Sequence, residues 1–168
     1  MYVKKNKFNF LFSVFLVFII LINFNSCKSK VNNSIIIQSS DIEYYPANFE
    51  LLNLPENRIE IIRFHHTEEC DDCFIIGNAF LSILKKEYSE LCQKGIITYR
   101  AVNSELLSNK SLCEKYESLE EDLVLNTVIN NKDNLSHLHD LWLLTKDLEK
   151  LNSKIKELLD KELQNIVE

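Results

Sequence analysis

Glycine and proline are scarce in this chain, and each occurs only twice among its 168 residues. The sequence contains no repeat and no low-complexity tract, so its length suits one compact domain with a leader rather than two domains. It also lacks a glycine-rich phosphate loop, the feature that dinucleotide and nucleotide sites depend on. We therefore expect no flavin or nicotinamide site and no bound cofactor.

Basic residues are in the minority as well. The chain has 19 lysines and arginines against 25 aspartates and glutamates, a net charge of −6. Lys4, Lys5 and Lys7 are the only charged residues within 1–26, so the rest of the chain carries 16 basic and 25 acidic side chains. Such a surface repels phosphate backbones, which argues against nucleic acid as a partner.

The first residues have the pattern of a secretory leader. Three lysines precede an apolar run from Phe8 to Ile22, which is shorter than the roughly 20 residues of a membrane-spanning helix. Cys27 directly follows Ser26, and this resembles a bacterial lipobox. We expect 1–26 to be a signal peptide and Cys27 to carry a lipid, with an uncleaved anchor as the alternative. The protein would then be tethered to a membrane of the bacterial cell envelope, facing the periplasm or the cell exterior.

A strand followed by a cysteine pair marks the start of the expected domain, 58–168, after a tether and lead-in over 27–57. Residues 59–64 are rich in β-branched and aromatic side chains and predict a strand. Cys70 and Cys73 come next, and helical periodicity follows them. The apolar positions of that helix are Ile76, Phe80, Ile83, Leu84, Tyr88 and Leu91.

This arrangement suits thiol–disulfide exchange. Cysteines three apart in the first turn of a helix lie close enough to form a disulfide, and the helix N-terminus favours a thiolate. We expect Cys70 to be the nucleophile and Cys73 the resolving thiol, with His65 or His66 carrying the proton. The partners would be protein thiols or disulfides, and turnover would make the chain an oxidoreductase.

Two other interpretations stay open. Cys70 and Cys73 could bind zinc or copper together with His65 and His66, in a metal-binding or protein-docking module without redox turnover. The cysteines could also form an inert structural clip, although a loop this short constrains the unfolded chain little.

Four acidic residues flank the cysteines: Glu68, Glu69, Asp71 and Asp72. Their negative charge disfavours a thiolate at Cys70, against the effect of the helix. A less stable thiolate accompanies a less oxidising pair. We therefore expect a reductant or electron carrier rather than a strong oxidase.

The rest of the sequence predicts a layered α/β arrangement with helices on both faces of the sheet. Gly95 is a plausible helix stop, and Asn103 or Ser104 can cap the next helix. We expect strands at 96–102, 123–129 and 135–138, helices at 105–117 and 146–167, and a hairpin turn at 130–134.

Four further side chains are expected to have structural roles only. Cys92 and Cys113 should be free and buried, because cysteine packs as a small hydrophobe. His137 and His139 should face solvent rather than bind metal. Trp142 should be a core anchor under the last helix.

The order of elements, with C-x-x-C after the first main strand, resembles the thioredoxin superfamily. More narrowly, the segment Ile61–His65, the pair Cys70 and Cys73, and the late strand Leu123–Leu125 resemble the thioredoxin-like family labelled nitrophenyl compound nitroreductase subunit, or ArsF. The resemblance implies a three-layer sandwich around a mixed sheet of about four strands. The nitroreductase activity in the label is not carried over, because no cofactor site accompanies it.

One departure from the superfamily concerns the substrate groove. Thioredoxins have a cis-proline just before the third strand, facing the cysteine pair, whereas residues 119–122 here contain no proline. The resemblance then implies that Glu120, Glu121 or Asp122 is the groove residue instead. It also leaves more room for a metal beside the two sulfurs.

Overall fold

A computed structural model describes residues 42–49, 52–118 and 120–167 of the chain. The expected signal peptide and the lipidation site at Cys27 lie outside these residues. Within the described part, no helix has both the length and the apolar character needed to cross a membrane.

The described chain contains five strands, with helices after β2, β3 and β5. The strands are β1 (Ile42–Tyr45), β2 (Arg58–His65), β3 (Ile97–Asn103), β4 (Asp122–Val128) and β5 (Leu135–His137). The α-helices are α2 (Asp71–Glu87), α3 (Ser89–Gln93), α4 (Lys110–Lys115) and α5 (Leu148–Val167). Two 3-10 helices, η2 (Leu107–Asn109) and η3 (His139–Leu144), complete the set. The predicted α/β order is confirmed.

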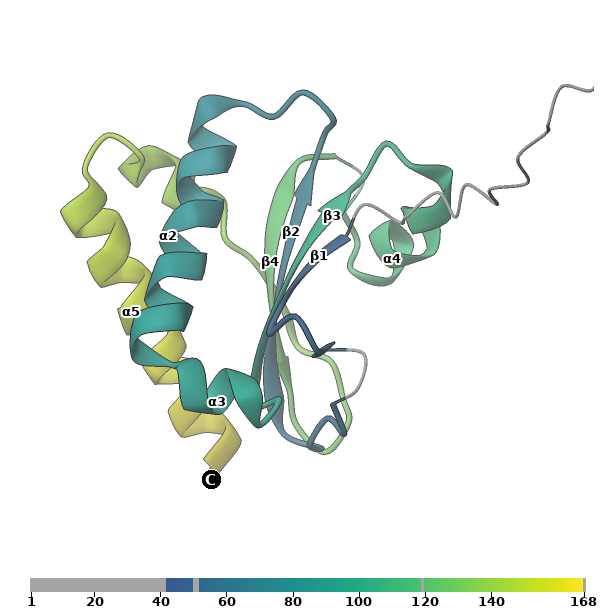
Figure 1. The fold of residues 1–168 in the computed structure, drawn as a ribbon, viewed down its shortest axis with the longest axis vertical. Helices are drawn as coiled ribbons and strands as arrows, with labels where there is room; N and C mark the ends of the chain where they lie inside the picture. The colour runs from purple at the N-terminus through teal and green to yellow at the C-terminus, as the bar shows by residue number, and fades with distance from the viewer. Residues whose placement is uncertain (1–41, 50–51, 119, 168) are drawn as a thin grey trace, which may run out of the picture. The chain divides into compact units, whose positions relative to one another are not determined.

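The sheet is mixed and has the strand order β1-β3-β2-β4-β5 (Figure 1). Strands β2 and β3 run parallel, and the other neighbours are antiparallel. The sheet therefore has five strands rather than about four. The additional strand, β1, lies within the expected lead-in, so the sheet begins before residue 58.

Helices cover both faces of the sheet (Figure 1), as the sequence predicts. The larger core lies under α2, α3 and α5, and the smaller core lies under α4. Because β2 is central and buried on both sides, its alternate residues serve both cores. Ile59 and Ile61 belong to the larger core, and Ile62 and Phe64 belong to the smaller one.

Two predicted turns are confirmed by their backbone angles. Asn130 and Asn131 have φ of 52° and 59° between the bridged residues Ile129 and Lys132. Asparagine tolerates this left-handed region, which a tight two-residue hairpin requires. Gly95, with φ of 72°, follows the end of α3.

The predicted helix over 105–117 is wrong at its start, because a 3-10 turn, η2, precedes α4, which begins only at Lys110. One local and one tertiary hydrogen bond hold the first residues in a turn instead. The backbone N–H of Glu105 donates to Asn103 Oδ1, and the Glu105 carboxylate accepts from the backbone N–H of Thr67. Asn103 and Ser104 therefore do not cap α4, whose N-cap is Asn109.

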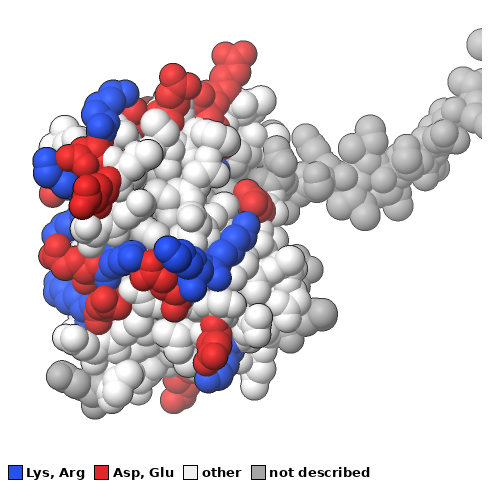
Figure 2. Space-filling model, turned by 60° about the vertical axis from the view of Figure 1, so that its left-hand side comes forward, with Lys and Arg blue, Asp and Glu red and all other residues white. Residues whose placement is uncertain are grey.

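Helix α5 combines a buried apolar stripe with a charged outer surface. Its buried residues are Leu151, Ile155, Leu159 and Ile166. Figure 2 shows Lys and Arg side chains interspersed with Asp and Glu on the face that carries α5 and α2. Pairs such as Lys154–Glu157, at 2.7 Å, are exposed and contribute about 0–1 kcal/mol each. The apolar stripe therefore supplies most of the attachment of α5.

Glu60 is a buried charge on β2, beneath the helix α4 side of the sheet. Its carboxylate accepts hydrogen bonds from Tyr116 Oη at 2.6 Å and from Asn126 Nδ2 at 3.1 Å. Arg58 and Arg100 pair with it at 2.8 Å and 3.4 Å. Burial alone would raise its pKa, but the hydrogen bond from Tyr116 and the two arginines outweigh burial and hold the pKa of Glu60 below its usual 4.5.

We expect Glu60→Gln to lower the free energy of unfolding by about 2–4 kcal/mol near neutral pH, because the substitution leaves Arg100 buried without its counter-charge. A carboxylate with a lowered pKa stabilises the fold above its unfolded pKa, and this contribution is lost as the pH falls through the folded pKa. The difference between wild type and variant should therefore shrink below pH 4.5.

Urea denaturation at several pH values measures this difference. Glu157→Gln, on the surface of α5, is the matched control and should change the unfolding free energy by less than about 0.5 kcal/mol. A pH-independent difference for Glu60→Gln would contradict the assignment of its effect to charge.

Candidate functional site

The two cysteines lie where α2 begins. Cys70 is the N-cap of α2, and its Sγ accepts a hydrogen bond from the backbone N–H of Cys73 at 3.2 Å. A disulfide joins Cys70 and Cys73, whose Cα atoms are 5.3 Å apart, a normal separation for such a bond. The predicted sequence of strand, cysteine pair and helix is confirmed.

The two sulfurs differ in their access to solvent. Cys70 is exposed, whereas Cys73 is only 2% exposed and belongs to the core side of α2. An incoming thiol or disulfide can therefore reach Cys70, while Cys73 is shielded behind it. This asymmetry is what a nucleophile and a resolving thiol require.

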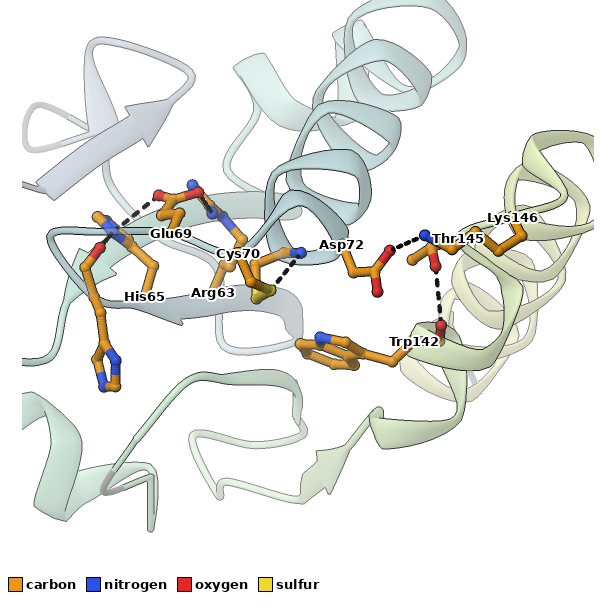
Figure 3. The surroundings of a disulfide bond; sticks show 10 residues. Arg63, His65, Glu69, Cys70, Asp72, Trp142, Thr145 and Lys146 are labelled. Atoms are coloured by element: carbon orange, nitrogen blue, oxygen red, sulfur yellow. Dashed lines mark hydrogen bonds and ion pairs between the residues drawn. A yellow bond between two sulfur atoms is a disulfide. The ribbon is translucent and has the colours of Figure 1, made fainter.

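A buried arginine lies beneath the start of α2. Arg63, on β2, donates to Glu69 at 2.6 Å (Figure 3). It also donates to Tyr99 Oη at 2.9 Å. Burial disfavours its charged form, but Tyr99 and Glu69 outweigh burial and raise the pKa of Arg63. Arg63 therefore stays charged and ties the end of β2 to the residue before Cys70.

Cations offset two of the acidic side chains that flank the cysteines. Glu69 contacts His65 Nδ1 at 2.9 Å as well as Arg63. Asp72 pairs with Lys146 at 3.1 Å (Figure 3), and Thr145 and Lys146 hold the pKa of Asp72 below its usual value. The net negative field on Cys70 is thus smaller than the sequence alone implies.

Glu121 is the carboxylate that the fold brings to the cysteines. One of its oxygens lies within 4.8 Å of both sulfurs, and among the described residues it has no ion pair. The other two predicted groove residues differ: Glu120 is exposed, and the carboxylate of Asp122 contacts His137. Of the three groove candidates, the geometry places Glu121 beside the disulfide.

The described histidines do not join the cysteines. A metal site built from Cys70, Cys73, His65 and His66 was one interpretation of the sequence. The ligand-type group around the two sulfurs contains Glu121 instead. His65 is engaged with Glu69, and its Nδ1 also lies 2.9 Å from the carbonyl oxygen of His66.

Trp142 is both a core residue and a neighbour of the disulfide. It is partly buried and packs on the larger core, in line with the expected structural role. It is also among the residues around the cysteine pair (Figure 3). The sequence pattern does not indicate that Trp142 lies near the cysteines. It does carry a signal for Arg63, namely a charged residue inside an otherwise apolar strand.

The other two described cysteines are not candidates for exchange. Cys92 and Cys113 are free and buried, as predicted. Burial raises the pKa of Cys92 to about 12 and also raises that of Cys113, which disfavours a reactive thiolate at either position.

Comparisons with known proteins give no relative: no protein-family model, no curated protein and no solved structure matches this chain. The resemblance to thioredoxin-like proteins therefore stays a prediction from the sequence and the order of elements.

Gly77 allows α2 to pass over Arg63, since a Cβ there would lie 2.8 Å from Arg63 Nε. We expect Gly77→Ala to lower the free energy of unfolding by about 1–3 kcal/mol, because Arg63 is held by two partners and cannot move freely. Alanine's higher helix propensity would act in the opposite direction, by about 1 kcal/mol.

Chemical denaturation measures the change. Asn78→Ala, at the next and exposed position of α2, is the control and should be neutral or stabilising by a few tenths of a kcal/mol. A Gly77→Ala protein that is more stable than wild type would contradict this expectation, because it would show that the Arg63 side chain moves aside without loss of stability.

Proposed function

We propose that this chain is a lipid-anchored thiol–disulfide exchange protein of thioredoxin-like type, acting on protein thiols or disulfides outside the cytoplasm. The single observation that carries the proposal is an exposed Cys70 at a helix N-terminus, bonded to a buried Cys73. The α/β architecture supports the thioredoxin-like assignment, since the cysteine pair follows the central strand of a mixed sheet. The lipid anchor is supported by the leader pattern and Cys27 alone.

The exchange has two steps. The Cys70 thiolate attacks one sulfur of a substrate disulfide, forms a mixed disulfide and releases the first substrate thiol. Cys73 then gives up its proton and attacks Cys70 Sγ, which closes the internal disulfide and releases the second substrate thiol. Two electrons and two protons pass to the substrate in total. The backbone N–H of Cys73 faces Cys70 Sγ and would stabilise the attacking thiolate.

The charged side chains near the two sulfurs indicate the direction in which the cysteine pair transfers electrons. Arg63 offsets the charge of Glu69 and Lys146 offsets that of Asp72, whereas Glu68, Asp71 and Glu121 have no ion pair among the described residues. Of these three carboxylates, Glu121 is the one grouped with both sulfurs, within 4.8 Å. A negative charge there opposes a thiolate and favours the disulfide. We therefore propose that the pair acts as a reductant or electron carrier.

Cysteine variants test the exchange. Cys70→Ser should abolish the thiol-dependent reduction of insulin disulfides, because it removes the attacking sulfur. Cys73→Ser should still attack, but it should accumulate a mixed disulfide, since no thiol remains to release the substrate. Turbidity of reduced insulin and non-reducing electrophoresis measure the two effects. Cys113→Ala, a buried cysteine away from the pair, should leave the rate unchanged.

Intact-mass measurement separates the alternatives in the same samples. A reversible gain of two hydrogens with mild reductant supports exchange, whereas a disulfide that resists dithiol reductant would support an inert clip. Zinc or copper retained by the reduced chain but not by the oxidised chain would favour the metal-binding alternative, for which Cys70, Cys73 and Glu121 are the grouped donors. The mass of the membrane-extracted protein also shows whether Cys27 carries a lipid.

Glu121→Gln should make the pair more oxidising. A unit charge within 4.8 Å contributes about 1 kcal/mol in a water-like dielectric, equivalent to about 20 mV for a two-electron couple. We expect the reduction potential to rise by roughly that amount when measured by equilibration with glutathione. Glu120→Gln, one residue away and exposed, is the matched control and should shift the potential less. An unchanged reduction potential in Glu121→Gln would show that Glu121 does not make the cysteine pair more reducing.

A further inference from the structure

A second group of ligand-type side chains lies at the start of β4, apart from the disulfide. The register pairs Val124 with His137, and the backbone N–H of Leu138 donates to the carbonyl of Leu123 at 2.9 Å. His137 is the last residue of β5, and His139 is the first residue of η3, just beyond it. The end of β5 and the start of η3 therefore both bring an imidazole to Asp122 at the start of β4.

The two imidazoles approach the two oxygens of one carboxylate. His137 Nδ1 lies 2.5 Å from Asp122 Oδ2, and His139 Nδ1 lies 3.8 Å from Asp122 Oδ1. The rings stack with centroids 5.8 Å apart and an interplanar angle of 15°. One donor atom from each of the three residues lies within 4.8 Å of the others.

The carboxylate is held in place. The side chain of Asp122 is only 9% exposed, and its Oδ1 accepts the backbone N–H of Leu123 at 2.7 Å. His137 is half-buried beside it, whereas His139 is 72% exposed and free to turn. The expectation that both histidines face solvent is thus wrong for His137, because Asp122 draws it against the sheet edge.

We propose that Asp122, His137 and His139 bind one divalent transition-metal ion, such as zinc. Two imidazoles and one carboxylate are ligands that such ions prefer, and three protein ligands leave a coordination position for water or substrate. Donors on a tetrahedral ion with bonds of about 2.0–2.2 Å lie roughly 3.4 Å apart. The two histidines contact different oxygens of Asp122, so the exposed His139 side chain must turn to bring its nitrogen onto the same ion as His137 and one carboxylate oxygen.

The surroundings favour a cation. The group lines an open hollow together with Glu117, Glu120 and Glu121. These carboxylates attract a positive ion and leave it accessible from solvent. The site shares no ligand with the disulfide, so it goes beyond the exchange proposed above and does not depend on it.

Metal titration of the full-length chain in detergent tests the proposal, with the Cys70–Cys73 disulfide kept oxidised. Zinc affinity is measured by competition with a chromophoric chelator, and cobalt replaces zinc for spectroscopy. We expect one ion per chain. We also expect visible cobalt bands without the thiolate-to-cobalt charge transfer that sulfur ligation produces. His139→Ala and Asp122→Asn should each weaken zinc binding at least tenfold.

Asp140→Asn is the matched control, since it removes an exposed carboxylate next to His139 that is not part of the group, and it should leave zinc affinity unchanged. Because His139 is exposed, its replacement should not alter the thermal unfolding of the metal-free chain. Equal zinc affinity in His139→Ala and wild type would overturn the proposal. A cobalt spectrum dominated by thiolate charge transfer would also overturn it, since the ion would then be held by cysteine.

Discussion

The central strand β2 carries two charged residues into the protein, and the fold depends on neutralising both. Glu60 points to the α4 side, where Tyr116, Arg58 and Arg100 surround it. Arg63 is buried beneath α2, against Tyr99 and Glu69. A buried charge without a partner costs several kcal/mol, so these pairs fix the positions of the elements that supply the partners.

The Arg63 pair has a direct consequence for the cysteines. Glu69 is the residue before Cys70, so its ion pair with Arg63 ties the segment leading into α2 to the strand beneath. Gly77 gives the guanidinium room below the helix, one turn beyond Cys73. The disulfide is therefore supported by a charge network rather than by a flexible loop, and Cys70 stays exposed while Cys73 stays buried.

Two adjacent residues at the start of β4 belong to two chemically different groups of side chains. Glu121 lies beside the two sulfurs, and Asp122 contacts the two histidines. Glu121 lies in the bend before β4 and Asp122 is the first residue of that strand, so the two neighbours serve different sites. The segment leading into β4 thus carries a carboxylate for each group.

The sequence by itself determined the order of elements, the position of the cysteines at a helix start and the hairpin at Asn130 and Asn131. These follow from local periodicity, capping and turn preferences, which act over a few residues. Only the tertiary structure decided which carboxylate reaches the sulfurs and that Asp122 meets His137 and His139. Those contacts depend on strand pairing between segments about 15 residues apart or more, and local pattern does not specify such pairing. The shortened α4 has a related origin, because the long-range hydrogen bond from the Thr67 backbone N–H to Glu105 and the bond from Asn109 to the carbonyl of Asn103 outweigh the helix propensity of the residues before α4.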